Sequence, residues 1–183
     1  MSTPLQVTVS RLRTPVTEED HIRGTSDAPV TVVVYADFQC PHCGAAHPNL
    51  TELLRQRAEV VRLVFRHFPI INVHPYAENA AETAEAAGAR GQFWTMHDWL
   101  FEHQDQLDPV HLSLGVQQLG LPLDEVAEEL RTHAHLGPVR DDFVTGIRSG
   151  VDHAPTFFVN GIRHDGSYAL TELLAAVDQA AGT

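Results

Sequence analysis

The sequence of 183 residues predicts an α/β fold in which a long helical segment interrupts the sheet. One observation is a β-branched apolar run at Val30–Tyr35, which precedes the only two cysteines and a helical pattern. A second is that strand signals occur only near the two ends of the chain. A third is that residues 75–149 carry helical patterns and hardly a strand signal. We therefore divide the chain into a first sheet half at 1–70, a helical insertion at 71–149 and a second sheet half at 150–183.

The composition is that of a globular protein with an acidic surface. The formal net charge is −12, from 24 acidic residues and 12 arginines, and there is no lysine. This charge disfavours nucleic acid and anionic membrane surfaces as partners. No apolar run approaches a membrane span, and Met1–Gln6 lacks the apolar core of a secretion signal. As written, the sequence predicts a cytoplasmic protein; we expect a periplasmic or extracytoplasmic one if a signal segment has been removed.

The run Cys40-Pro41-His42-Cys43 joins the predicted strand to the predicted helix. Cys40 is expected at the helix N-terminus, where free N–H groups and the helix dipole favour a negative sulfur. Pro41 suits the first helical position because its missing N–H costs nothing there. His42, when protonated, adds positive charge beside the thiolate. Cys43, one turn further along, is placed to attack Cys40 and to resolve a mixed disulfide.

The cysteine pair has two other interpretations. A structural disulfide is disfavoured, because closing so short a loop removes little entropy from the unfolded chain. A zinc site with His42 or His47 as a further ligand stays open, although one chain cannot supply four cysteines. Redox chemistry is the preferred interpretation. We expect no cofactor and no metal, since the redox-active group is the Cys40–Cys43 disulfide itself.

The first part of the chain is expected to form three strands and a helix. Weak alternation predicts a short edge strand at Leu5–Leu12, and turn residues predict a connecting loop at 14–29. Val30–Tyr35 is expected as the central strand, followed by a helix to about Arg57. Val60–Phe68 predicts a further strand, parallel to the central one because a helix joins the two.

The middle of the chain is expected to hold four or five helices. An alanine- and glutamate-rich helix is predicted at Pro75–Ala89. From Phe93 to Phe101, apolar residues at helical spacing form one face, which includes His97 as a core histidine. Asp108 followed by proline predicts the N-cap of another helix. The remaining helices are expected at Leu123–His133 and Val139–Arg148.

Strand signals return after Gly150. Pro155–Val159 predicts a strand, and Asn160-Gly161 predicts a hairpin turn that leads into Ile162–His164. Apolar residues along one face predict a last helix at Leu170–Ala181.

Several short stretches of the sequence, taken together and in their order along the chain, resemble those of a known family. The first is the active-site run Asp37–Cys43 with its Pro-His dipeptide. The others are Phe65–Pro69, His74-Pro75, Phe93–Asp98 and Gly150–Gly161. Together they resemble the DsbA-like thiol-disulfide oxidoreductases of the thioredoxin superfamily, over about residues 20 to 181. The resemblance implies a thioredoxin fold with an inserted helical subdomain.

The resemblance also implies roles for residues of the second sheet half. Pro155 is expected to have a cis peptide bond and to face the cysteine pair. Ala154 and Thr156, on either side of it, are expected to bind an extended substrate segment. Taken together, the implied catalytic residues are Cys40, Cys43, Pro41, His42 and Pro155.

One position departs from the resemblance. Six residues before the first cysteine the family often carries a buried acid, and here Val34 stands in that place. Asp37 is the nearest carboxylate, but the alternation of the strand points it to the other face. We therefore expect water or a histidine to exchange the proton of Cys43.

Three functions are compatible with these residues. The first is an oxidant of protein dithiols, because a stabilised Cys40 thiolate favours the reduced form and makes the disulfide oxidising. The second is a cytosolic reductase or isomerase that uses the same residues. The third is a metal- or partner-binding module without catalysis. For the first two we expect a monomer that meets protein thiols or disulfides. Its redox partner would be a reductase, a quinone-linked oxidase or a low-molecular-weight thiol.

Overall fold

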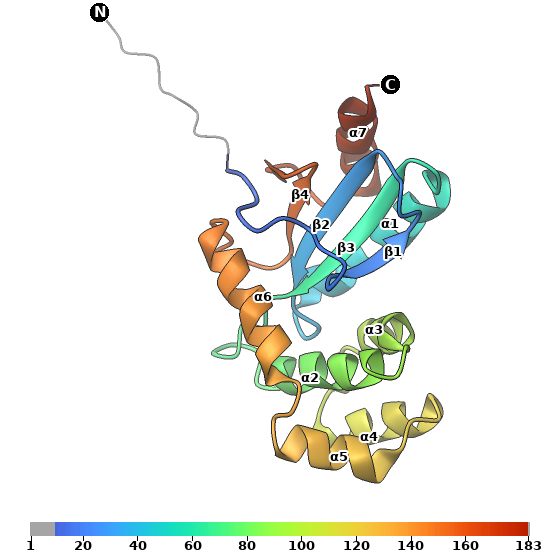
Figure 1. The fold of residues 1–183 in the computed structure, drawn as a ribbon, viewed down its shortest axis with the longest axis vertical. Helices are drawn as coiled ribbons and strands as arrows, with labels where there is room; N and C mark the ends of the chain where they lie inside the picture. The colour runs from blue at the N-terminus through green and yellow to red at the C-terminus, as the bar shows by residue number, and fades with distance from the viewer. Residues whose placement is uncertain (1–9, 183) are drawn as a thin grey trace, which may run out of the picture.

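Five strands form one mixed sheet in the order β1-β3-β2-β4-β5 (Figure 1) in a computed structural model that describes residues 10–182. Strand β2 is parallel to β3 on one side and antiparallel to β4 on the other, while β1 and β5 are the edges. The strands are β1, His21–Gly24; β2, Val30–Ala36; β3, Val61–His67; β4, Thr156–Val159; and β5, Ile162–His164.

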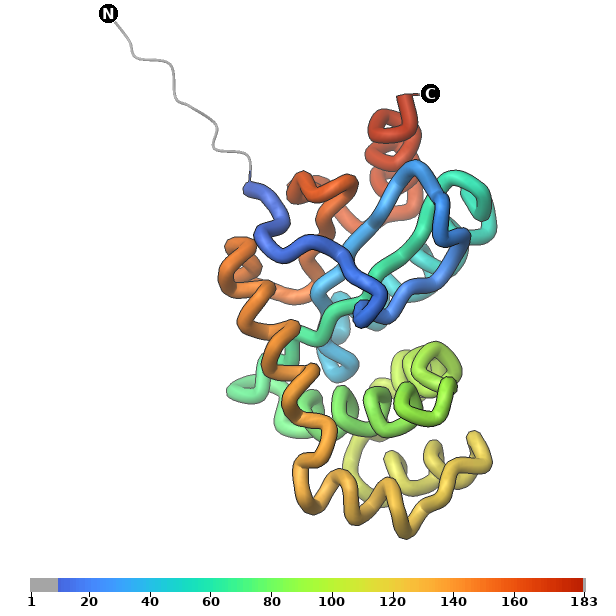
Figure 2. The backbone as a smooth tube through the Cα atoms, in the orientation of Figure 1, coloured from blue at the N-terminus to red at the C-terminus, as the bar shows by residue number. Residues whose placement is uncertain are grey.

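Two helices pack on the sheet, and five lie between β3 and β4. Helices α1 and α7 contact each other and the strands, whereas α2 to α5 gather at one end of the molecule (Figure 1). Helix α6 then leads the chain back past β3 to the sheet, as the tube in Figure 2 shows. No helix among residues 10–182 is both long and apolar enough to cross a membrane. The bounds are α1, Pro41–Gln56; α2, Ala77–Gly88; α3, Phe93–Glu102; α4, Pro109–Gln118; α5, Leu123–Arg131; α6, Leu136–Arg148; and α7, Leu170–Ala181.

Strand β2 is the centre of the core. Its β-branched residues suit a pleated strand, and all of them except Thr31 are buried. Burial of successive residues means that both faces of the strand are covered, as in other strands with a parallel partner. The predicted central strand and its parallel neighbour are therefore confirmed.

The prediction of a loop throughout 14–29 is wrong in part, because strand β1 lies within it. The four residues His21–Gly24 are too few to show an alternating pattern, and they become a strand by pairing antiparallel with β3. The edge strand expected at Leu5–Leu12 lies mostly outside the described residues. Within them, Arg11 forms an isolated bridge with Ile162. The other predicted strands and helices are present, and Asp108 caps α4 by accepting hydrogen bonds from backbone N–H groups.

A buried ion pair ties the segment before β1 to the sheet. The Arg66 guanidinium in β3 binds both carboxylate oxygens of Asp20, at 2.7 and 3.1 Å. Its remaining N–H groups donate to the Tyr35 hydroxyl and to the carbonyls of Thr14 and Pro15. Since every donor of the buried cation has an acceptor, the pair is fully hydrogen-bonded.

Removing the carboxylate of this pair should destabilise the fold strongly. Asp20→Ala leaves the Arg66 guanidinium buried without its anion, which we expect to lower the free energy of unfolding by about 3–5 kcal/mol. Urea denaturation followed by circular dichroism measures this loss. Glu52→Ala, which breaks the exposed pair with Arg55, is the control and should change stability little. Equal losses in the two variants would contradict the assignment.

Candidate active site

The cysteine pair lies where the chain leaves β2 and enters α1. Cys40 is the N-cap residue of α1 and Pro41 is in its first turn, as predicted. Cys43 follows one turn into the helix. Both cysteines are free thiols and both are buried, with exposed fractions of 5% and 2%. The Cys40 sulfur is therefore near the unpaired N–H groups of the helix start, in a site largely shielded from water.

The two thiols have opposite pKa shifts. A hydrogen bond from the Cys43 side chain lowers the pKa of Cys40 to about 6, and backbone N–H groups of Cys43 and His42 add to this against the effect of burial. Burial raises the pKa of Cys43 well above its ordinary value, and the adjacent Cys40 sulfur raises it further. Near neutral pH, Cys40 is therefore the thiolate, and Cys43 keeps its proton.

The loop before β4 reaches the first cysteine. The Ala154–Pro155 peptide bond is cis, and the Cys40 sulfur lies 3.3 Å from the Ala154 carbonyl oxygen. Thr156 is buried as the first residue of β4, and its hydroxyl donates to the His153 carbonyl. The structure thus brings Ala154 and Pro155 to Cys40, while the Thr156 side chain is engaged within the loop.

A groove of about 510 Å³ opens beside this loop. His42 and the loop from His153 to Thr156 are in its lining. The segment from Arg163 to Tyr168 completes the groove. An extended peptide lying in it would therefore pass the Ala154 carbonyl, next to the Cys40 sulfur.

The His42 ring is exposed and has a partner that the sequence did not indicate. Its Nδ1 lies 3.1 Å from the Tyr168 hydroxyl. The Tyr168 carbonyl in turn accepts a hydrogen bond from the Asn49 amide in α1. These contacts fasten the segment before α7 to the active-site helix and orient the ring at the rim of the groove.

Beneath the cysteines, a small cavity adjoins the position of the missing acid. It has about 10 Å³ of space, roughly one water molecule, and Cys43, Val34, His47 and His97 line it. Burial lowers the pKa of His47, and it lowers the pKa of His97 to about 4, so both rings are neutral at pH 7. Neutral imidazoles can accept a proton.

The Asp37 carboxylate is turned away to other partners. It accepts hydrogen bonds from the backbone N–H groups of Gln39 and Ile70 and contacts the His74 ring. Its backbone N–H lies 3.4 Å from the Cys43 sulfur. The carboxylate thus holds the loop that begins at Ile70 against the active-site segment.

Comparisons with known proteins agree with this geometry. Residues 16–179 match the model of a family described as thioredoxin. The oxidised form of BdbD from Bacillus subtilis superposes with a TM-score of 0.85 at 19% identity, over 96% of this chain and 98% of that one. Wolbachia pipientis α-DsbA1 superposes with a TM-score of 0.80 at 20% identity, over 93% and 94%. This chain belongs to the thioredoxin family, and its fold is similar to that of the DsbA proteins. The predicted thioredoxin fold with inserted helices is thereby confirmed.

Curated relatives of this thioredoxin-superfamily chain are much longer proteins. The chain is 49% identical over 160 residues to the Na⁺/H⁺ antiporter NhaA 3 of Salinispora tropica, over 87% of its own length and 24% of that protein. It is 36% identical over 180 residues to NhaA 1 of Mycobacterium sp. strain KMS, over 97% and 29%. The chain thus spans about a quarter of the length of these relatives.

Gln104 is a further site residue that no sequence pattern marked. From the segment after α3, its amide nitrogen donates to the carbonyls of Phe38 and Cys40, at 2.8 and 2.7 Å. Its side chain approaches Gly44 so closely that a Cβ there would clash with it. The helical insertion therefore holds, through Gln104, the segment that carries the first cysteine.

The pKa of Cys40 should depend on a donor at position 43. Cys43→Ala removes the side-chain hydrogen bond, so the pKa of Cys40 should rise from about 6 towards that of a free thiol. Cys43→Ser keeps a hydroxyl donor and should stay closer to the parent. Ultraviolet absorbance of the thiolate against pH measures each value. If alanine and serine gave the parent value alike, the helix terminus alone would set the pKa.

Proposed function

We propose that this chain is a thiol-disulfide oxidoreductase that oxidises protein dithiols. The observation that carries the proposal is the unequal pair of sulfurs, in which the pKa of Cys40 is about 6 and that of Cys43 is raised. A stabilised thiolate lowers the free energy of the reduced protein, and so makes its disulfide a stronger oxidant. The lowered pKa also makes Cys40 a good leaving group.

The exchange would proceed in two displacements. A substrate thiolate attacks the Cys40 sulfur of the disulfide, which forms a mixed disulfide and releases Cys43 as a thiolate that takes up a proton. The second substrate thiolate then attacks the substrate sulfur and expels Cys40 as a thiolate. The substrate loses two electrons and the protein gains them. A redox partner must therefore accept these electrons and restore the Cys40–Cys43 disulfide.

We propose a flexible protein segment as the substrate. The groove along residues 153–156 and the Ala154 carbonyl offer backbone pairing beside the reactive sulfur. Asp37 accepts a hydrogen bond from the backbone N–H of Ile70, and Gln39 accepts one from that of Tyr76, so the loop between Ile70 and Tyr76 is held beside the site. This loop adds exposed apolar side chains. These side chains are Ile71, Val73 and Tyr76, which are 54%, 69% and 36% exposed.

For the proton of Cys43, we propose His47, acting directly or through one water. His47 lies one helical turn after Cys43 on α1, and both residues line the small cavity. Val34 cannot exchange a proton, and the Asp37 carboxylate is engaged with other groups. The clusters of three or more potential metal ligands among residues 10–182 include neither cysteine, so exchange is favoured over metal binding at this pair.

The reduction potential of the Cys40–Cys43 pair is the decisive measurement. Protein equilibrated in glutathione buffers should give a value near the oxidising end of a scale from about −270 mV for thioredoxin to about −120 mV for DsbA. A value near the reducing end would replace the oxidant by a reductase or isomerase. No reversible couple at all would rule out exchange by this pair.

Substituting each cysteine in turn should show which sulfur forms the mixed disulfide with substrate and which one resolves it. Cys40→Ser should abolish exchange with a dithiol peptide, whereas Cys43→Ser should accumulate a mixed disulfide through Cys40. Non-reducing electrophoresis and intact mass measure the adduct, and Glu52→Ala, outside the groove and with both sulfurs kept, is the control that should exchange as the parent does. Activity in Cys40→Ser, together with no adduct in Cys43→Ser, would reverse the two roles.

A further inference from the structure

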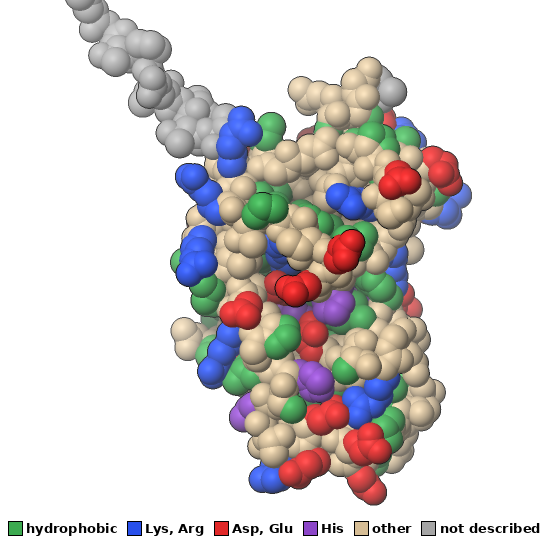
Figure 3. Space-filling model, viewed as in Figure 1, with side chains coloured by type: hydrophobic (Ala, Val, Ile, Leu, Met, Phe, Trp, Pro, Cys, Tyr) green, Lys and Arg blue, Asp and Glu red, His purple; other side chains and the backbone are tan. Residues whose placement is uncertain are grey.

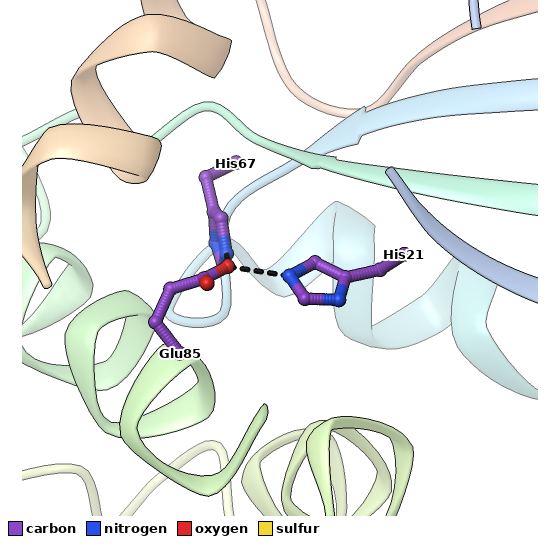
Figure 4. Close-up of side chains that lie close together, drawn as sticks. All are labelled: His21, His67 and Glu85. Carbon is purple, nitrogen blue, oxygen red and sulfur yellow. Dashed lines mark hydrogen bonds and ion pairs between the residues drawn. The ribbon is translucent and has the colours of Figure 1, made fainter. Parts of the chain in front are cut away.

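A second group of reactive side chains lies away from the cysteines, where the inserted helices meet the sheet. His21 on β1, His67 at the end of β3 and Glu85 on α2 converge there (Figure 4). The Nε2 atoms of the two histidines lie 2.6 and 2.8 Å from the same oxygen of Glu85. Both rings therefore point at one carboxylate, from two strands on one side and a helix on the other.

We propose that His21, His67 and Glu85 bind a divalent transition metal, with Zn²⁺ as the cation that the donor set fits best. Two imidazole nitrogens and one carboxylate oxygen are a zinc ligand set that leaves a fourth position open. This inference does not depend on the proposed redox function, because it involves neither cysteine.

The rings are held in a way that suits coordination. His21 stacks on Phe93, with ring centroids 3.4 Å apart and planes 4° from parallel, so its Nε2 faces Glu85. His67 is 1% exposed, and its other nitrogen, Nδ1, is buried without a hydrogen-bond partner. In the metal-free protein the Nε2 proton is therefore the one that the ring donates to Glu85. A metal bound at Nε2 would take the place of this proton beside the same carboxylate, and the neutral ring would then carry its proton on Nδ1.

The fit requires a small adjustment. Tetrahedral zinc with bonds of about 2.0–2.1 Å places its ligand atoms about 3.3 Å apart, which is wider than the present contacts of 2.6 and 2.8 Å by about 0.5–0.7 Å. Glu85 is a flexible side chain on the hollow, and His21 is 22% exposed. Both can move by this amount without disturbing the buried ring of His67.

The surroundings favour a cation and give it a path. Figure 3 shows histidine and acidic side chains gathered in the middle of the face towards the viewer. An open hollow of about 440 Å³ includes His21 and Glu85 together with Asp20, Asp141 and Asp142 in its lining. Its one arginine, Arg66, is engaged with Asp20. Water in the hollow can supply the fourth ligand.

The other two clusters of potential ligands in the described part of the chain are less suited. In the group His47, His97 and Asp98, both oxygens of the carboxylate bind the Arg23 guanidinium, a cation that repels a metal. The remaining group, Glu78, Glu82 and His133, offers a single nitrogen, on a ring that is 53% exposed. His133 is therefore a matched control.

Zinc titration of the full chain tests the proposal. Cys40→Ser and Cys43→Ser are introduced together, so that no thiolate competes for the metal. Isothermal titration with Zn²⁺ should show one equivalent bound, and Co²⁺ should give the absorption of a four-coordinate site. Loss of a residue that hydrogen-bonds to a metal ligand weakens binding by about 10–100-fold. His21→Ala removes a ligand itself, so it should weaken binding by more than this. Bound Zn²⁺ should also raise the melting temperature, and His21→Ala should lose this rise.

Two further variants complete the test. Glu85→Gln keeps the shape of the side chain while removing its charge, so it should also weaken binding if His21→Ala folds poorly. His133→Ala should bind as the parent does. Absence of a saturable equivalent in the parent would overturn the proposal, as would equal affinities of the parent, His21→Ala and Glu85→Gln.

Discussion

The pairing of β2 with β3 on one side and β4 on the other is the constraint on which the candidate active site depends. Tyr35 lies opposite Thr156 in the antiparallel β2–β4 pair, so the segment leaving β2 and the segment entering β4 meet at one end of the sheet. The contact of Cys40 with Ala154 follows from this register. A slip of one residue would turn every side chain of the strand to the opposite face. Backbone hydrogen bonds in the buried sheet thus determine the position of the reactive sulfur.

The chemistry of the site comes from placing two identical side chains in different surroundings. Cys40 receives hydrogen bonds at the start of α1, whereas Cys43 is buried one turn inside the helix. The position of Val34 has no carboxylate. His47 on α1 and His97 on α3 line the same cavity and supply polar groups there. Helices inserted between two strands thereby contribute both to the cysteine surroundings and, through Gln104, to the backbone of the N-cap.

Elements with a strong local pattern were predictable, and contacts between distant segments were not. The valines of β2, the proline at the start of α1, the Asp108 cap and the Asn160-Gly161 turn, with positive φ at both positions, each act within a few residues. Strand β1 was missed because its four residues become a strand only by pairing with β3. Tyr168 and Gln104 carry no local signal for the site. Equally, nothing local places His21 beside His67, since that contact depends on which strand lies next to β3.

The insertion of five helices between β3 and β4 also affects how the chain is completed during synthesis. Strand β2 can pair with β3 soon after both emerge, but its other edge must wait for β4, about 120 residues later. At a synthesis rate of about 5–20 residues per second, this wait is roughly 6–24 s. During that interval a valine-rich edge with unpaired N–H and C=O groups is a template for another strand. Nascent chains on neighbouring ribosomes are therefore most prone to pair with one another before β4 is made.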